Sequence, residues 1–277
     1  MSLHDPNRVT IRTLRRHVRE GKPFAMLTCY DATTAKWLAR AGVETLLVGD
    51  TAAVMMLGHE TTNPAPLEFM LLITAAVRRG APNCFVMGDM PFMSYQVDDR
   101  EAARNAGRFI TEGGADAVKL EVDETFEATV RAVTRASVPV VAHIGWRPQR
   151  LARYGTAVVA GKTQEKVQKL VDLARRMEDA GAAMLLVEAA TAEAGKAIVE
   201  AVTIPVIGCG AGPDCHGHVV VLHDWLGLTD WQPSFAPAAV QGGEFIRDAA
   251  RKWIERVESG EYLTDKGAYH IQKDADG

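Results

Sequence analysis

Two apolar stretches of this 277-residue chain run into Gly-Asp, and the two aspartates are the first candidates for chemistry. Residues 45–48 are followed by a glycine and Asp50, and residues 84–87 by a glycine and Asp89. Apolar runs this short are typical of strands buried on both faces. Because functional side chains of parallel α/β folds gather where the strands end, both aspartates are expected at one edge of the sheet. Each one alone could equally cap the next helix. Their repetition favours a site for a hard cation such as Mg²⁺.

Four more ionisable residues end later apolar runs: Lys119, Glu121, His143 and Glu188. Lys119 and Glu121 are two positions apart in a predicted strand, so they face the same side. They could form a mutual ion pair with no further role, or Lys119 could hold a substrate carboxylate. Glu188 follows five apolar residues, and desolvation there would make it a stronger general base. His143 taken alone is more often a structural histidine.

Two polar or glycine-rich segments follow the last predicted strands. The turn Gly210-Ala211-Gly212 permits close approach of the backbone to an anion or a planar ring. Phosphate binding is the broader alternative for such a turn. His223 and Asp224 follow the last apolar run and are expected at the same edge.

Regular alternation of strand and helix patterns positions these residues. Eight apolar runs are predicted as strands, at residues 24–30, 45–48, 84–87, 117–121, 138–144, 183–188, 205–208 and 219–222. Amphipathic segments separate most of them, which favours a (β/α)₈ TIM barrel. A short N-terminal helix precedes the barrel and a C-terminal helical extension follows it, in a single domain over residues 1–277. A doubly wound open sheet is the alternative, although the usual nucleotide-binding fingerprint after the first strand is missing.

Composition excludes several classes of protein. The chain is 47% hydrophobic and 24% charged, with a net charge of −4 and no basic patch, so nucleic acid is a poor candidate partner. No apolar run is long enough to span a membrane, and residues 1–6 do not resemble a signal peptide. The four cysteines lack metal-ligand spacing, as expected for buried thiols in a cytoplasmic protein.

With these residues in place, the chain resembles the ketopantoate hydroxymethyltransferase (3-methyl-2-oxobutanoate hydroxymethyltransferase) family, and the match runs through most of its length. The matching segments are residues 47–51 (LVGDT), 58–59 (GH), 74–83 (TAAVRRGAPN), 89–92 (DMPF), 118–121 (VKLE), 142–145 (AHIG), Glu188 and 204–212 (IPVIGCGAG). The resemblance implies a (β/α)₈ barrel related to the phosphoenolpyruvate mutase and isocitrate lyase enzymes. It also implies a cytoplasmic homo-oligomer, commonly a decamer, that works in pantothenate synthesis.

The resemblance further implies roles for individual residues. Asp50 and Asp89 correspond to Mg²⁺ ligands, and Thr51 and Lys119 to the pair that holds the 2-oxoacid carboxylate. Glu121 and His143 correspond to groups around the metal and the keto oxygen. Glu188 corresponds to the base that removes the C3 proton of 3-methyl-2-oxobutanoate. The resulting enolate attacks the methylene group of 5,10-methylenetetrahydrofolate, the co-substrate, to give 2-dehydropantoate.

Two loops, at residues 58–66 and 153–162, depart from the family's usual sequences, so the acceptor 2-oxoacid and the one-carbon donor stay open. One alternative is a C–C lyase or mutase of the same superfamily, although the Lys-Lys-Cys-Gly-His loop typical of the lyases is missing. Another is a non-catalytic paralogue that binds a 2-oxoacid.

Overall fold

The computed structural model describes residues 7–262 and 267–270, and within them eight parallel strands close into one barrel. The strands follow in chain order around the barrel, each paired with the next and β8 with β1. They are β1 Phe24–Thr28, β2 Thr45–Val48, β3 Phe85–Asp89, β4 Ala117–Glu121, β5 Val140–Gly145, β6 Met184–Glu188, β7 Val206–Cys209 and β8 Gly217–Val220. The prediction of a (β/α)₈ barrel is therefore confirmed, and the open-sheet alternative is excluded.

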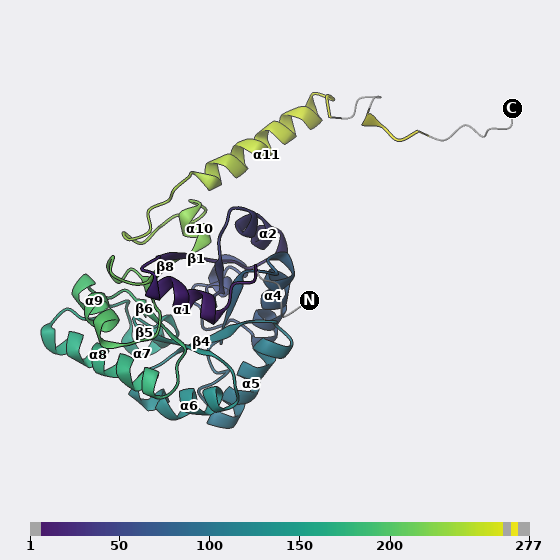
Figure 1. The fold of residues 1–277 in the computed structure, drawn as a ribbon. Coiled ribbons are helices and arrows are strands. Elements are labelled where there is room, and N and C mark those ends of the chain that lie inside the picture. The colour runs from purple at the N-terminus through teal and green to yellow at the C-terminus, as the bar shows by residue number, and fades with distance from the viewer. Residues whose placement is uncertain (1–6, 263–266, 271–277) are drawn as a thin grey trace. The chain divides into compact units, whose positions relative to one another are not determined.

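Helices surround the strands (Figure 1). Those of the barrel are α1 Ile11–Arg19, α2 Ala32–Arg40, α4 Leu67–Gly80, α5 Asp99–Thr111, α6 Glu127–Arg135, α8 Gln164–Asp179 and α9 Ala192–Ala201. Several begin at a side chain that accepts a backbone N–H bond, such as Asp31 before α2 and Asp98 before α5. Short helical turns lie in the connecting loops: α3 Ala52–Met55, η1 Glu124–Phe126, η2 Pro148–Arg150 and α7 Leu151–Tyr154.

The barrel interior is filled by every second side chain of the strands. Phe24, Met26, Phe85 and Met87 belong to this buried cluster, and Leu14 of α1 joins it. The same period of two continues to the strand ends, where the inward side chains become polar. The apolar layers thus form a floor beneath a group of ionisable residues.

The ends of some elements differ from the sequence prediction. The last strand, β8, begins and ends two residues earlier in the sequence than the predicted run of residues 219–222. A glycine is needed there, because a Cβ atom on Gly217 would meet the Phe24 ring at 2.4 Å. His223 and Asp224 follow β8 less directly than predicted, because the strand ends at Val220 and the two residues lie within the short helix α10 Leu222–Trp225. Their place at the functional edge stays a prediction.

The chain divides into two compact units, residues 1–222 and 223–277. The first contains the whole barrel. The second contains α11 Gly242–Glu258, which confirms the predicted C-terminal helix and has no buried side chain. This division does not test whether the units fold separately, so the single domain stays a prediction.

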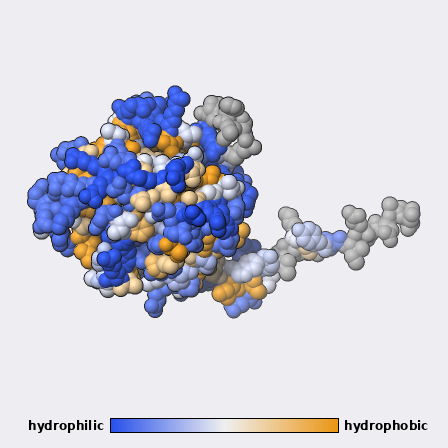
Figure 2. Space-filling model, turned by 90° about the horizontal axis from the view of Figure 1, so that it is seen from below, coloured by the Kyte–Doolittle hydropathy of each residue, from blue (hydrophilic) through white to orange (hydrophobic). Residues whose placement is uncertain are grey.

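The surface in Figure 2 is mainly hydrophilic, with smaller hydrophobic patches among the polar side chains. Among the described residues, no helix combines the length and the apolar character needed to cross a bilayer. Residues 1–6, which the sequence indicated not to be a signal peptide, lie outside the described part.

Candidate active site

Asp50 and Asp89 lie together at the carboxyl ends of β2 and β3, as the sequence predicts. The backbone N–H of Asp50 donates to Oδ2 of Asp89 at 2.9 Å, and both residues are buried. A Cβ atom on Gly49 would lie 2.9 Å from the Thr51 hydroxyl, so the glycine makes room for the turn after β2. The Thr51 hydroxyl lies 2.8 Å from the hydroxyl of Tyr30, at the end of β1. Three neighbouring strands therefore meet at this edge.

Lys119 projects into the barrel above Ala117, in register with Asp89 of the neighbouring strand. Its Nζ lies 2.8 Å from Oδ1 of Asp89, so the buried ammonium pairs with Asp89, and the sequence alternative of a mutual Lys119–Glu121 pair is not what forms. Burial disfavours the ammonium, but the charges of the nearby carboxylates outweigh burial and raise the pKa of Lys119. Lys119 therefore stays positively charged.

Glu121 is buried two residues beyond Lys119 on the same inward face of β4. Burial raises the pKa of Glu121 well above its usual range, and the charges of Asp50 and Asp89 add to this effect. Its Oε1 atom has no hydrogen-bond partner among the described residues. Three buried carboxylates thus share one ammonium, so ionising all three would leave an excess of negative charge, and the protonated form of Glu121 is favoured for this reason.

A divalent cation would balance this negative charge, and the carboxylate oxygens are suitable ligands for it. Asp50 and Asp89 supply hard anionic oxygens, and Oε1 of Glu121, which accepts no hydrogen bond from the described residues, lies 3.8 Å from Nδ1 of His143 beside them. Among the described residues, however, no three His, Cys, Asp or Glu side chains are close enough to hold a metal ion by themselves. A Mg²⁺ ion held here would keep waters or substrate oxygens among its ligands, as Mg²⁺ usually does.

His143 lies between this cluster and Glu188. Its Nδ1 is 3.3 Å from Nζ of Lys119, and its Nε2 is 3.3 Å from Oε2 of Glu188. Burial, followed by the charge of Lys119, lowers the pKa of His143, so its ring is neutral at neutral pH. Because an ammonium can only donate, Nδ1 accepts from Lys119 and the ring proton sits on Nε2, facing Glu188.

Glu188 ends β6 and is less buried than the sequence suggested, with 24% of its side chain exposed. Desolvation of this carboxylate is therefore partial. The exposure also means that Glu188 can meet a molecule entering from solvent, whereas His143 behind it is almost fully enclosed. This is the arrangement required of a general base that faces a substrate.

Sequence reasoning missed two polar residues in this cluster, Gln149 and Tyr95. Gln149 lies in η2 after β5, and its Nε2 donates to Oδ2 of Asp50 at 2.9 Å. The hydroxyl of Tyr95, in the loop after β3, donates to Oε1 of Gln149 at 2.8 Å. Both side chains are buried. The only signal in the sequence was their place in loops that follow strand ends.

The Gly210-Ala211-Gly212 turn packs against α9. A Cβ atom on Gly212 would lie 2.5 Å from Cα of Ala192, and one on Gly195 would lie 2.0 Å from the carbonyl oxygen of Ala211. The close approach that the glycines permit is thus made by a helix of the same chain. The sequence expectation of an anion or a ring at this turn stays a prediction.

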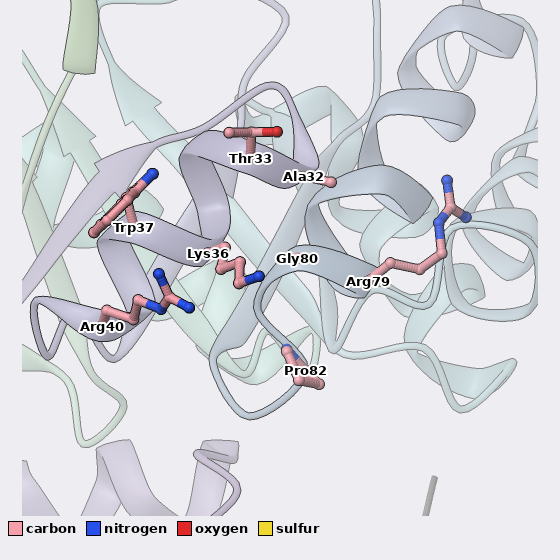
Figure 3. Close-up of a pocket in the computed structure, with 8 residues that line it drawn as sticks. All are labelled: Ala32, Thr33, Lys36, Trp37, Arg40, Arg79, Gly80 and Pro82. Carbon is pink, nitrogen blue, oxygen red and sulfur yellow. The ribbon is translucent and has the colours of Figure 1, made fainter. Parts of the chain in front are cut away.

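A separate groove of about 590 Å³ lies outside the barrel between α2 and α4 (Figure 3). Its lining residues are Ala32, Thr33, Lys36, Trp37, Arg40, Arg79, Gly80 and Pro82. The guanidinium of Arg40 lies 4.9 Å from the centre of the Trp37 ring. None of these residues belongs to the ionisable cluster.

Comparison with known proteins identifies the family of this chain. The family model described as ketopantoate hydroxymethyltransferase matches residues 8–265. The chain belongs to the ketopantoate hydroxymethyltransferase family. Two of its relatives are 3-methyl-2-oxobutanoate hydroxymethyltransferases. The protein of Clostridium novyi (strain NT) is 40% identical, with 95% of this chain and 96% of that protein covered. The protein of Koribacter versatilis (strain Ellin345) is 41% identical, with 97% and 92% covered.

Solved structures with the same fold are more distant than these ketopantoate hydroxymethyltransferases. A 2,3-dimethylmalate lyase of the phosphoenolpyruvate mutase/isocitrate lyase superfamily has a TM-score of 0.58 at 16% identity, with 94% of this chain and 92% of that chain covered. A phosphonopyruvate hydrolase has a TM-score of 0.62 at 14% identity, with 95% and 93% covered. These likenesses show the fold alone. Family membership therefore favours the transferase over the lyase or mutase alternative.

Proposed function

We propose that this chain transfers a hydroxymethyl group from 5,10-methylenetetrahydrofolate to C3 of 3-methyl-2-oxobutanoate, giving 2-dehydropantoate for pantothenate synthesis. The observation that carries the proposal is the placement of Glu188. It is the one partly exposed carboxylate of the described cluster, backed by neutral His143 and facing a buried group with one ammonium and three carboxylates. A base opposite a cation-binding site is what enolisation of a 2-oxoacid requires.

Each residue has a role in this reaction. Lys119, with the hydroxyl of Thr51, binds the substrate carboxylate through a charge-assisted hydrogen bond. Asp50, Asp89 and Glu121 would hold Mg²⁺, which would polarise the 2-oxo group and stabilise negative charge on it. Glu188 removes the C3 proton, and the Nε2–H of His143 supports the Glu188 carboxylate before the transfer.

The carbon–carbon bond then forms between C3 and the methylene carbon of the folate. The bonds from that carbon to the two folate nitrogens break. Water supplies the hydroxyl group of the product and a proton to one nitrogen, and the proton taken up by Glu188 goes to the other. The protein's part is to exclude bulk water from the buried side of the enolate, where the apolar floor of the barrel lies.

The test is turnover with a panel of 2-oxoacids, each with methylenetetrahydrofolate and Mg²⁺. We expect 3-methyl-2-oxobutanoate to be the best acceptor and turnover to stop when the metal is chelated. Binding of 2-oxoacids without turnover would favour a non-catalytic paralogue. Cleavage of a 2-oxoacid or a malate derivative, in place of transfer, would favour a lyase.

We also propose that the protein is a cytoplasmic homo-oligomer. The helix α11 exposes Phe245, Trp253 and Ile254, which suits a helix that packs against another copy. Cys29, Cys84 and Cys215 are buried thiols outside any disulfide, as expected in a reducing compartment. Light scattering coupled to size exclusion would report the number of copies, and a monomer would contradict the assembly.

A further inference from the structure

Gln149 occupies a position in the cluster that the proposed chemistry leaves unassigned. It follows Pro148 in η2 and is buried although it lies in a loop. Its side chain reaches Asp50, and its backbone N–H donates to Oε2 of Glu121 at 3.1 Å. One residue therefore contacts two of the three carboxylates that would hold the cation.

The direction of the Gln149 amide is determined by its neighbours. Its Nε2 lies 3.0 Å from the carbonyl oxygen of Met90, which can only accept, so the NH₂ group must point that way. On the other side, Gln96 donates to Oε1 at 3.0 Å, and Tyr95 donates to the same oxygen. All these contacts agree on one orientation, in which the NH₂ group is presented to Asp50.

Tyr95 connects the amide to the backbone of β4. The N–H of Glu121 donates to the Tyr95 hydroxyl at 3.0 Å. The hydroxyl proton donates to Oε1 of Gln149 at 2.8 Å, which is nearer than its other acceptor, the carbonyl oxygen of Glu121 at 3.2 Å. The result is a chain of donors from the β4 backbone through Tyr95 and Gln149 to Asp50.

Ion pairs and a hydrogen bond outside the cluster also hold the loop that carries Gln149. Arg147 and Arg150 flank it, and both guanidinium groups pair with Asp123, two residues beyond Glu121. Arg147 also donates to the carbonyl oxygen of Val122 at 2.8 Å. The segment from 147 to 150 is thus tied to the end of β4 on both sides of Gln149.

We infer that Gln149 is a positioning residue for the divalent cation, holding one oxygen of Asp50 so that the other faces the cation, with Tyr95 setting the amide direction. This inference rests on the proposed function, because it takes Asp50 and Glu121 as cation ligands. Outer partners of metal ligands commonly change metal affinity by 10- to 100-fold when they are removed.

The experiment is calorimetric titration of the metal-free protein with Mg²⁺ in the absence of substrate. Gln149→Met keeps the length of the side chain but removes the donor, and we expect the Kd for Mg²⁺ to rise by about tenfold or more. Tyr95→Phe keeps the ring and should raise the Kd less. The double variant should match Gln149→Met alone, because Tyr95 acts through Gln149. If Gln149→Met does not fold, Tyr95→Phe carries the test.

Gln168→Met is the matched control. Gln168 donates to Asp172 at 2.9 Å, the same kind of bond, but on the exposed face of α8. Its removal should leave Mg²⁺ affinity unchanged. A second readout is rescue, since Mg²⁺ raised above the Kd of Gln149→Met should restore C3 proton exchange in 3-methyl-2-oxobutanoate to near the wild-type rate. A merely structural defect would not be rescued by the metal.

An unchanged Kd in folded Gln149→Met, or additive effects of the two substitutions, would overturn the inference while leaving the proposed function intact. A wild-type protein that binds no Mg²⁺ would overturn the cation site and this inference together. A wild type that binds Mg²⁺ but transfers no hydroxymethyl group would count against the proposed function alone.

Discussion

Nε2 of His143 lies 3.3 Å from Oε2 of Glu188, and the two side chains differ sharply in exposure, at 1% and 24%. The buried ring is neutral and carries its proton on the atom that faces the carboxylate, because Lys119 occupies the other ring nitrogen. Glu188 thereby has a proton-bearing ring nitrogen close behind it, while part of its side chain is exposed to solvent. This relation makes Glu188, and not His143, the proton acceptor in the proposed reaction.

The first prediction follows from that assignment. In D₂O with Mg²⁺, the enzyme should exchange the C3 proton of 3-methyl-2-oxobutanoate for deuterium without any folate, as NMR would show. Glu188→Gln should slow this exchange by about a hundredfold or more, while 2-oxoacid binding survives. Glu193→Gln, at an exposed position in the first turn of α9, is the control. Wild-type exchange in Glu188→Gln would move the base to His143.

The second prediction concerns the cation. Asp89→Asn removes one hard anionic ligand, so the affinity for Mg²⁺ should fall by about tenfold or more in calorimetric titration. The matched control is Asp98→Asn at the start of α5, since asparagine caps a helix as well as aspartate does. Equal Mg²⁺ affinity in the wild type and in folded Asp89→Asn would exclude Asp89 as a ligand.

The third prediction separates the substrate from the metal. Lys119→Met keeps the side-chain volume but removes the ammonium, so KM for the 2-oxoacid should rise several-fold or more. Affinity for Mg²⁺ should not fall, because the carboxylates lose their competing cation. Lys36→Met, in the groove outside the barrel, serves as the control. Steady-state kinetics with an unchanged KM would leave Lys119 with a structural role only.

The fourth prediction concerns pH and stability. Nδ1 of His216 accepts from the N–H of Val206 at 3.0 Å, and burial lowers the pKa of His216 below 6.5. The unfolded chain therefore binds more protons than the folded chain just below pH 6.5. The stability that the neutral His216 contributes is complete above that pH and is lost as the pH falls. His216→Asn keeps an acceptor that does not titrate. Urea unfolding at about pH 7.5 and about pH 5 should show a smaller difference in the variant than in the wild type.

The fifth prediction tests the packing of α9 on the glycine-rich turn. Gly195→Ala places a Cβ atom 2.0 Å from the carbonyl oxygen of Ala211, so the free energy of unfolding should fall by about 1–3 kcal/mol. Gly107→Ala in α5 is the control, because no atom lies within 4 Å of its added Cβ. That change should stabilise by about 0.5–1 kcal/mol. Equal stability of the two variants would contradict the packing.

The barrel and most of its ionisable edge could be predicted from the sequence because both depend on local patterns. Short apolar runs that alternate with amphipathic segments predict buried parallel strands with covering helices. The period of two then places Lys119 and Glu121 on one face, and the ends of the runs place Asp50 and Asp89 at one edge. The observed strand ends differ from the predicted ones where tertiary packing sets them. At Gly217, for example, the absence of a side chain leaves room for the Phe24 ring.

Only the tertiary structure decided which groups pair. Gln149 and Asp50 are 99 positions apart, and no residue type or spacing links a loop glutamine to a distant strand end. Lys119 pairs with Asp89 because the register of β3 and β4 sets them side by side, and a single strand's sequence does not contain that register. The sequence determined which residues reach the edge of the barrel. Barrel closure decided their partners, because hydrogen bonds and ion pairs form between atoms that only the folded chain brings within reach.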